Sequence, residues 1–459
     1  MLIDHESSGT PHAAKSAQRS RLLIIACACD PDNSMEDRNG WHRAIQAAED
    51  FDVTVLTIPS VNTGRLHQAV PNHLKGRVEF FCVPLSTFQA KRLQCDKSFY
   101  LGYRAWLLAG KKLAEKLHAE RPFAVTHLVS LCSYREAGYF WQIDCPFILG
   151  PVGGSSGFPV RYLSLVHFRS AAFEIARNLI NFYQLHFSQR VRKAIQSSAV
   201  VIAANRSTQG DLMKMVEGLN VPVELEAGLD YEISVPKDIR DISRPLKILW
   251  SGRLRAWKGL PLLLKALAKL PHDVPVQLRI VGDGVEAKAW RRLAQRLGLS
   301  DCVEWISRPP YRDSISYYRW ADVFCFTSLR DTSGTGLLEA LAAGTPIIGM
   351  NHQGAADIMT DDCAIRISVI KPSQSICEFT DALAMLARNP DRLKKLSDGA
   401  LKEAESHLWS RKSIFMNRVY QSLLANSRIQ PDSPKWNGKP QQVSSLSDDC
   451  ELAREATHR

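Results

Sequence analysis

Short, mostly apolar runs alternate along this chain with longer stretches in which apolar side chains recur at helical spacing. Five of the clearest runs lie at residues 22–29, 53–58, 246–251, 276–281 and 323–327. Continuous apolar runs of this kind are typical of strands that are buried on both faces of a parallel sheet. The alternation of strands and helices therefore predicts an α/β protein with doubly wound parallel sheets.

The 459 residues are enough for two ordinary domains with additional segments at both ends. The first segment has no apolar run, and the last is polar and rich in Pro and Ser, a composition that buries too little apolar surface to fold. We therefore predict a flexible tail at 1–20, a Rossmann-like domain at 21–235, a second Rossmann-like domain at 246–405, a helix at 406–425 and a disordered tail at 426–459.

Composition narrows the class of partner. The net charge of +11 favours an anionic partner, namely a phosphorylated substrate, a membrane surface or nucleic acid. We expect no nucleic-acid partner, because the chain shows neither an aromatic and basic platform nor a helix-turn-helix pattern. The eleven cysteines are scattered without a C-x-x-C pair, so neither a zinc ribbon nor a disulfide framework is indicated.

The stretch at residues 160–196 is predicted to be largely helical and carries six basic residues against one acid, with apolar side chains between them. A basic amphipathic helix can lie on an anionic membrane or hold a lipid-phosphate acceptor. It can also pack its apolar face into the core and expose a basic outer face, and we prefer this second interpretation. No segment is apolar for the ~18 residues that a membrane helix needs. The N-terminus also lacks an apolar signal core, so we expect a cytoplasmic protein, peripheral to the inner face of the cell membrane if the first interpretation holds.

The strongest candidate for chemistry lies at residues 324–357, where a buried strand leads into a polar loop. Gly334 and Gly336 open the following helix, and the free N–H groups of a helix start form an anion site. Asp331 precedes this helix, where it can meet hydroxyl groups, and Glu339 lies within it, where a carboxylate can accept hydrogen bonds from a vicinal diol. Diol, phosphate and sugar in that order describe a nucleotide sugar. A solvated Asp and an exposed Glu are the alternative interpretation.

A second candidate follows the predicted strand at residues 246–251. The sequence GRLRAWKG at residues 252–259 places Arg253 and Lys258 five positions apart in a turn that opens a helix. This arrangement can hold a pyrophosphate, with Arg253 as a bidentate fork and Lys258 as a point charge. Fixed cations there would stabilise the negative charge that builds up on a leaving diphosphate. A pair of surface cations without a ligand is the alternative.

Together these stretches resemble the donor-site motifs of glycosyltransferase family 4. The family signature is an acidic residue, seven others, a Glu and then A-x-A-x-G-x-P, and here Asp331 and Glu339 are followed by ALAAGTP. Residues 252–259 are similar to the GR-x(4)-KG motif of the family. The chain departs from the pattern at Asp331, where Glu is usual, and at Thr332-Ser333, where a small and an aromatic residue are usual. Both departures fall where the sugar ring should lie, so they bear on the identity of the sugar.

Two stretches of the first domain resemble a bacterial polysaccharide-type subgroup of this family. They are CDPDNSMEDRNGWHRA at residues 29–44 and PFILGPVGG at residues 146–154. The resemblance places Gly40, Gly153 and Gly154 on acceptor-side loops, where glycine lets backbone approach a ligand closely. An ordinary surface loop and a tight turn are the alternatives.

The resemblance implies the GT-B architecture, in which two Rossmann-like domains face each other across a cleft and the last helix crosses back to the first. It implies catalytic roles for Arg253, Lys258, Asp331 and His127. His127 is included because a His near the carboxyl end of a parallel strand points into the ligand crevice, although a lone His is often structural. The residues implied in donor binding are Gly252, Glu339, Gly334, Thr335, Gly336, Arg308 and Gly282.

The implied activity is that of a retaining hexosyltransferase in the assembly of a bacterial exopolysaccharide, capsule or lipopolysaccharide. The donor would be a nucleotide sugar, a UDP- or GDP-sugar first, and the acceptor a glycan or a lipid-linked intermediate. No cofactor or metal is expected, because Arg253 and Lys258 can take the place of a cation at the diphosphate. Asp30-Pro31-Asp32 could hold a metal and is interpreted as a turn. The alternatives are a nucleotide-sugar 2-epimerase of the same architecture and a non-catalytic nucleotide-sugar-binding protein.

Overall fold

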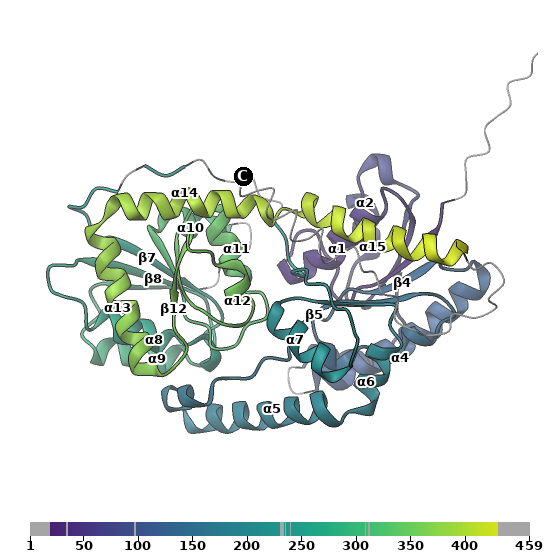
Figure 1. Cartoon of the computed structure of the whole chain (residues 1–459), viewed down its shortest axis with the longest axis horizontal. Coiled ribbons are helices and arrows are strands. Elements are labelled where there is room, and N and C mark those ends of the chain that lie inside the picture. The colour runs from purple at the N-terminus through teal and green to yellow at the C-terminus, as the bar shows by residue number, and fades with distance from the viewer. Residues whose placement is uncertain are drawn as a thin grey trace, which may run out of the picture.

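The computed structural model of the protein describes residues 19–33, 35–95, 98–229, 234, 236–238, 240–307, 309–310 and 313–429. The strands of this part of the chain form two six-stranded sheets, and all of their pairings are parallel. Each sheet lies at the centre of one lobe, with helices on both of its faces (Figure 1). The predicted α/β architecture with two doubly wound sheets is therefore confirmed.

The first sheet has the order β3-β2-β1-β4-β5-β6. Its strands are β1 (Arg21–Ile25), β2 (Asp52–Thr57), β3 (Val78–Cys82), β4 (Val125–Leu128), β5 (Phe147–Val152) and β6 (Val200–Ala203). Successive side chains of a strand point to opposite faces, so Leu23 and Ile25 fill one core cluster while Leu22 and Ile24 fill the other. Burial on both faces explains why this strand is a continuous apolar run.

Helices cover both faces of this sheet. They are α1 (Met35–Ala47), α2 (Thr63–Ala69), α3 (Thr87–Gln94), α4 (Phe99–Glu120), α5 (Phe168–Phe187), α6 (Gln189–Gln196) and α7 (Arg206–Met215). Short 3-10 turns lie between them, namely η1 (Asn72–Leu74), η2 (Tyr134–Glu136), η3 (Phe140–Gln142) and η4 (Val160–Leu165). Trp106 of α4 packs in one core cluster and Trp41 of α1 in the other, so each face of the sheet has its own apolar core.

The second sheet has the order β12-β11-β10-β7-β8-β9. Its strands are β7 (Leu246–Ser251), β8 (Val276–Val281), β9 (Val303–Ile306), β10 (Val323–Phe326), β11 (Ile347–Met350) and β12 (Ala364–Ile367). Its helical elements are η5 (Ala256–Lys258), α8 (Leu260–Leu267), α9 (Ala287–Arg296), α10 (Ser314–Trp320), α11 (Thr335–Ala342), α12 (Gln353–Ile358), α13 (Pro372–Arg388) and α14 (Pro390–Ser406). β7 pairs with β8 and β10 at the centre, so the loops after these three strands emerge next to one another.

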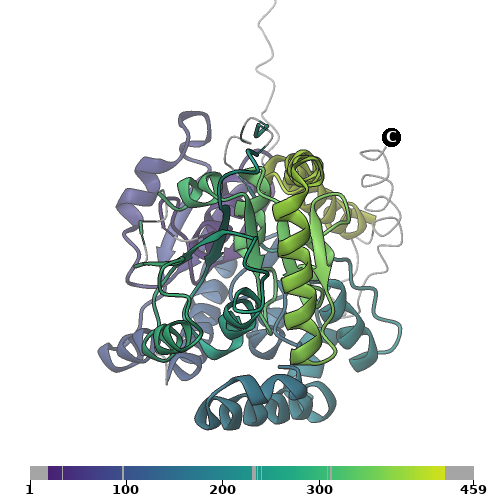
Figure 2. The same ribbon diagram turned by 90° about the vertical axis from the view of Figure 1, so that its left-hand side faces the viewer.

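The last described helix, α15 (Trp409–Ile429), leaves the second lobe and lies on the first (Figures 1 and 2). Met416, Val419 and Leu423 are buried in the same core cluster as strands β1 and β2. The helix runs four residues past the predicted end at residue 425, because no Gly or Pro interrupts the sequence before Pro431. Residues 1–18 and 430–459 of the two predicted tails lie outside the described residues.

Helix α5 runs beneath both lobes in Figure 1, and its inner face is polar. Glu174 and Asn181 are 1% and 5% exposed. Glu174 pairs with Arg330 of the second domain, and Asn181 accepts a hydrogen bond of 2.6 Å from the hydroxyl group of Tyr134. Polar partners on both lobes therefore hold this helix in place.

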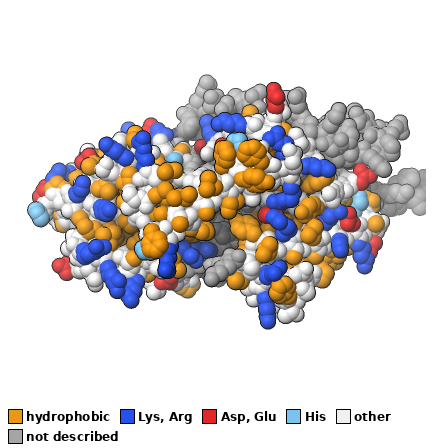
Figure 3. Space-filling model, turned by 90° about the horizontal axis from the view of Figure 1, so that it is seen from below, with side chains coloured by type: hydrophobic (Ala, Val, Ile, Leu, Met, Phe, Trp, Pro, Cys, Tyr) orange, Lys and Arg blue, Asp and Glu red, His pale blue; other side chains and the backbone are white. Residues whose placement is uncertain are grey.

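The outer face of α5 is apolar. Eight of its large apolar side chains are between 45% and 69% exposed: Phe168, Phe173, Ile175, Leu179, Ile180, Phe182, Tyr183 and Phe187. Figure 3 looks at the molecule from below and shows hydrophobic side chains spread over this side. The interpretation that the helix packs its apolar face into the core is therefore wrong, because the surfaces beneath it offer polar partners instead.

None of the helices among the described residues combines the length and the apolar composition that crossing a bilayer requires.

Candidate functional site

The loops that follow β7 and β8 touch each other through glycines. Gly252 adopts a φ of +159° and Gly282 a φ of +143°. A Cβ atom on Gly282 would lie 2.0 Å from the carbonyl oxygen of Gly252, so a side chain at this position is excluded. Both glycines belong to the predicted donor site, and the structure brings them into contact at the carboxyl edge of the second sheet.

The two predicted phosphate-binding cations, Arg253 and Lys258, lie in the loop that follows β7. Arg253 is exposed next to Gly252, whereas Lys258 ends the turn η5 and its side chain is 22% exposed. Gly259 adopts a φ of +65° and immediately precedes α8, and a Cβ atom there would lie 2.3 Å from the carbonyl oxygen of Thr327. The close approach allows the loop after β10 to pack against the loop after β7.

Lys258 forms an ion pair with Asp331 of the predicted signature. Both side chains are 22% exposed, so the pair lies partly in solvent. The structure thereby joins two predicted catalytic residues that are 73 positions apart in the sequence. A diphosphate can replace Asp331 as the partner of Lys258, and sugar hydroxyl groups can replace Lys258 as the partner of Asp331.

Helix α11 begins at the predicted small-residue turn. Gly334 has a φ of +62°, and a Cβ atom there would lie 2.9 Å from the ring of Phe326. Thr335 and Gly336 form the first turn of the helix and are partly exposed. The N-terminal N–H groups of α11 are therefore available to an anion next to the Lys258 and Asp331 pair.

Glu339 lies one turn further along α11 and is 9% exposed. Burial raises its pKa from the ordinary 4.5 to about 7, while a hydrogen bond with the side chain of Tyr318 acts in the opposite direction. The alternative interpretation, in which Glu339 lies on an exposed helix face, is therefore excluded. A buried carboxyl group at a helix start suits recognition of a hydroxyl pair.

The loop at residues 329–333, which carries Asp331 and is called the signature loop, also touches the first domain. A Cβ atom on Gly153 would lie 2.1 Å from the Cγ2 methyl group of Thr332, and the side-chain amide of Asn205 donates a hydrogen bond of 2.8 Å to the Thr332 carbonyl group. On the other side, a Cβ atom on Gly354 would lie 1.6 Å from the same carbonyl oxygen. Thr332, where the sequence departs from the family pattern, is therefore enclosed between the two domains.

Several polar residues of this site were not predicted as site residues. Gln353 accepts a hydrogen bond of 2.9 Å from the N–H group of Asp331 and donates one of 2.9 Å to the carbonyl group of Gly157 in the first domain. Its φ of +53° is unusual for a residue with a side chain. Ser333 donates to the buried carboxyl group of Glu226, whose pKa burial raises. Only the QGAA turn that contains Gln353 gave a local signal in the sequence.

His127 does not face the cleft, so this prediction is wrong. It is fully buried in β4, where Nδ1 lies 2.7 Å from the Tyr420 hydroxyl group and Nε2 lies 2.6 Å from the Gly150 carbonyl oxygen. Burial lowers its pKa from 6.5 to about 3. The side chain points into the sheet–helix interface rather than along the strand toward the ligand edge, so it links β4, β5 and α15.

Gly40 does not lie on a loop, so this prediction also needs correction. Helix α1 begins at Met35 and includes Gly40, where a Cβ atom would lie 2.3 Å from the carbonyl oxygen of Ala28. The glycine serves close packing of the helix against the chain after β1. Gly154 has a φ of +84° and follows Gly153 at the domain boundary. Arg308 lies outside the described residues.

The carboxylates of Asp30 and Asp32 both lie against Arg65, and the distance from Arg65 to Asp32 is 3.2 Å. Among the described residues, no group of three or more His, Cys, Asp and Glu side chains is placed to hold a metal ion.

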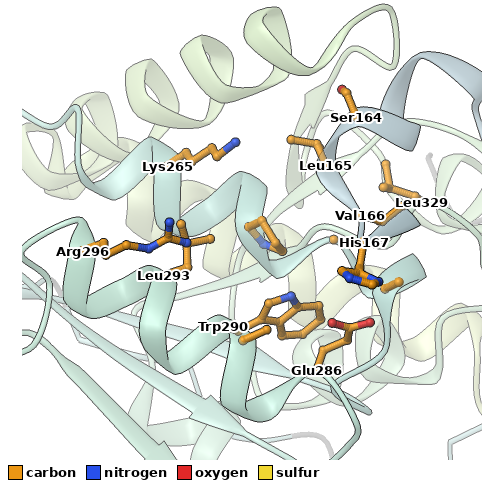
Figure 4. Close-up of a pocket in the computed structure, with 14 residues that line it drawn as sticks. Ser164, Leu165, Val166, His167, Lys265, Glu286, Trp290, Leu293, Arg296 and Leu329 are labelled. Carbon is orange, nitrogen blue, oxygen red and sulfur yellow. The ribbon is translucent and has the colours of Figure 1, made fainter. Parts of the chain in front are cut away.

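A cavity of about 250 Å³ lies behind the signature loop, between the segment 164–167 and helices α8 and α9 (Figure 4). Trp290 forms its floor, with Lys265 and Arg296 on one side and His167 and Glu286 on the other (Figure 4). None of the predicted site residues lines this cavity. The predicted donor site at the edge of the sheet is therefore a separate feature.

Residues 236–403 match the protein family described as glycosyl transferases group 1. One curated relative, the D-inositol 3-phosphate glycosyltransferase of Kribbella flavida, is 28% identical over 199 residues, which cover 40% of this chain and 46% of the relative. The enzyme of the same name from Corynebacterium glutamicum is 23% identical over 257 residues, covering 51% and 60%. The chain spans about half the length of these curated relatives.

Two solved structures show the same fold. Sucrose-phosphate synthase of Thermosynechococcus elongatus has a TM-score of 0.66 at 17% identity, covering 89% of this chain and all of the other. Anabaena HepE in complex with UDP has a TM-score of 0.58 at 16% identity, covering 88% and 100%. The predicted GT-B fold is therefore confirmed. Over residues 236–403, the stretch that holds the predicted donor motifs, the chain is similar to the group 1 glycosyl transferases.

Proposed function

We propose that the protein transfers a sugar from a nucleotide-sugar donor to an acceptor hydroxyl group. The observation that carries this proposal is the meeting of the loops after β7, β8 and β10 at one sheet edge. These loops hold the Lys258 and Asp331 ion pair, the open start of α11 and the buried Glu339. The two cations and the start of α11 suit a diphosphate, Glu339 suits a ribose diol, and Asp331 suits the hydroxyl groups of a sugar.

Each group has a proposed role. Arg253 and Lys258 hold the diphosphate, together with the N–H groups at Gly334, Thr335 and Gly336. Glu339 accepts hydrogen bonds from the ribose diol, and Asp331 accepts them from the sugar. The glycines at 252 and 282 keep this edge free of side chains, so that backbone lies close to the nucleotide. The complexes of HepE with UDP and with UDP-glucose support a uridine nucleotide as the donor to test first.

The proposed reaction needs no enzyme nucleophile. The acceptor hydroxyl group attacks the anomeric carbon on the face that the diphosphate leaves, and the leaving phosphate takes its proton, so the anomeric configuration is retained. Lys258 and Arg253 stabilise the charge on the leaving diphosphate more than the charge of the bound donor. We propose that no metal ion takes part, because these two cations already occupy that role.

The acceptor is proposed to carry negative charge. The net charge of +11 favours an anionic partner, and the names of the curated relatives point to phosphorylated inositol in those proteins. A lipid-linked intermediate in the assembly of a bacterial exopolysaccharide, capsule or lipopolysaccharide is the acceptor class that we put first. It matches the prediction of a protein at the inner face of a membrane.

The first test is thermal stability with UDP-, GDP-, ADP- and dTDP-sugars. We expect one nucleotide class to raise the melting temperature of the wild-type protein. Lys258→Ala should abolish this rise, because it removes a charge from the diphosphate site. Lys269→Ala is the matched control, since it removes an exposed cation from the carboxyl end of the helix that follows the same turn.

Products then separate the reactions. A transferase releases the nucleoside diphosphate faster when a membrane extract supplies acceptor, and the new glycoside keeps the donor configuration. Conversion of the nucleotide sugar into an epimer without an acceptor would support the 2-epimerase instead. If no donor raises the melting temperature, or if the rise survives Lys258→Ala, the proposed site is wrong.

A further inference from the structure

We propose that the outer face of α5 docks the protein onto an anionic lipid bilayer. This face consists of the eight exposed side chains named above, from Phe168 to Phe187. A large apolar or aromatic side chain carries roughly 150–250 Å², so eight that are about half exposed present on the order of 800 Å². The largest apolar patch of a typical monomer is about 300–600 Å², so this face calls for a partner.

The orientation of α5 is fixed by its inner face rather than by its apolar residues. Glu174 pairs with Arg330 over 3.2 Å, and the side chain of Asn178 bonds both backbone groups of Phe158 at 2.9 Å. Arg177 donates a hydrogen bond of 3.1 Å to the Ser156 carbonyl group. Turning the helix to bury its apolar face would break these polar contacts. The outward direction is therefore part of the fold and not a consequence of a loosely attached helix.

The exposed basic residues near this face favour an anionic bilayer over a second copy of this chain as its partner. Between Val160 and Gln196 the sequence has one acid, Glu174, which is buried, while Arg161, Arg169 and Lys193 are exposed. A symmetric dimer through residues 160–196 would set basic residues against basic residues, because the one acid of this segment is buried. Anionic lipid headgroups complement the same residues, each of which contributes about 1 kcal/mol near such a surface.

The docked face lies close to the proposed donor site. Arg330, the partner of Glu174 on α5, immediately precedes Asp331 in the signature loop. A bilayer under α5 would therefore bring lipid-linked molecules to the side of the protein on which the two domains meet. The docking itself needs neither a donor nor an acceptor, so it stands apart from the proposed transferase activity.

The test is sedimentation of the full chain with vesicles of phosphatidylcholine alone or mixed with phosphatidylglycerol. We expect the wild-type protein to bind the anionic vesicles and to be released by salt. The double variant Leu179→Glu, Phe182→Glu should lose at least about tenfold in affinity, because two apolar anchors are replaced by charges. Ile414→Glu on α15 is the matched control, since Ile414 is 55% exposed, as is Phe182; it should bind like the wild type.

A second double variant tests the proposal independently, in case the first double variant fails to fold. Arg169→Glu with Lys193→Glu leaves the apolar side chains in place and should abolish the preference for anionic over neutral vesicles. The proposal is overturned if the wild-type protein ignores anionic vesicles, or if both double variants bind them as well as the wild type does. It is also overturned if the wild-type protein is a dimer in solution that only the Leu179 and Phe182 changes dissociate, because a second copy then covers this face.

Discussion

Glu339 shows at the scale of one residue how the fold changes the chemistry of a predicted site. Its pKa is raised to about 7 by burial, so the folded protein keeps a proton that the unfolded chain releases near pH 4.5. Between these values the folded state binds more protons than the unfolded state, and its stability falls as the pH rises. Above pH 7 both states are ionised, and the full cost of the buried charge is present.

We expect Glu339→Gln to remove this part of the pH dependence. The difference in unfolding free energy between variant and wild type should change by on the order of 3 kcal/mol from pH 4.5 to pH 7.5, in favour of the variant at the higher pH. Urea unfolding at several pH values measures it, with Glu226→Gln as a second buried acid for comparison. A constant difference across this range would mean that the pKa of Glu339 is not raised in the folded protein.

His127 has a structural role instead of the predicted catalytic one. Its ring lies between the Tyr420 hydroxyl group and the Gly150 carbonyl group, and all of these groups are in the interior. Replacing it by Leu leaves a buried hydroxyl group without this partner, which costs about 1–3 kcal/mol.

A double-mutant cycle tests this role. His127→Leu and Tyr420→Phe should each destabilise the protein, and the double variant should cost about 1 kcal/mol less than the two single changes together. Urea unfolding gives the three values. Donor should still raise the melting temperature of all three variants. If only His127→Leu lost this rise, His127 would belong to the donor site after all.

At the scale of elements, α5 and the signature loop are joined by one buried ion pair. Glu174 is 1% exposed and contacts Arg330 through two hydrogen bonds of 3.2 Å. Arg330 also lies over the ring of Trp257, at 4.7 Å, in the turn that carries Lys258. Through Arg330, α5 is therefore connected with both parts of the predicted donor site: the turn that carries Lys258 and the loop that carries Asp331.

We expect Glu174→Gln to weaken donor binding by roughly fivefold or more, because the signature loop loses a fixed neighbour. Stability should fall by about 1–3 kcal/mol as Arg330 loses its partner. Calorimetric titration with the donor measures the first effect. Ser170→Ala is the control, since it removes another contact of α5, the 3.2 Å hydrogen bond with Glu286, away from the loop. Equal donor affinity in Glu174→Gln and wild type would contradict the connection.

The sequence predicts elements better than it predicts their contacts. Strand runs such as residues 246–251 are recognisable because burial on both faces demands apolar residues throughout, and the motif spacing locates Lys258 and Asp331. Glu174 and Arg330 are 156 positions apart, and no local pattern announces their contact. In α5 the spacing shows which residues share a face. It cannot show which face meets the protein, because the polar partners of the inner face come from other elements.

At the scale of the whole molecule, the first domain is completed by α15, which follows the second domain in the sequence. Phe415, Met416, Val419, Tyr420 and Leu423 of α15 are at most 8% exposed and pack against the first sheet. Burying each such side chain contributes about 1.5–3 kcal/mol, so together they match the net stability of a typical domain, about 5–15 kcal/mol.

A chain that ends at Ser406 should therefore lose the cooperative unfolding of its first domain, while a chain that ends at Ile429 should unfold like the full protein. Calorimetry and near-ultraviolet circular dichroism distinguish these cases. An unchanged first transition after removal of α15 would show that the sheet is stable without it.

The contact between Lys258 and Asp331 has a consequence for selectivity. In the free protein each of these side chains satisfies the other, so this pair presents little net charge to the medium. An inorganic phosphate ion that drew Lys258 away would leave the Asp331 carboxylate without a partner and would bind weakly for that reason. A molecule that carries a diphosphate and sugar hydroxyl groups side by side satisfies both residues at once. If the proposed donor site is right, the ion pair would thus favour a nucleotide sugar over free phosphate and other simple anions.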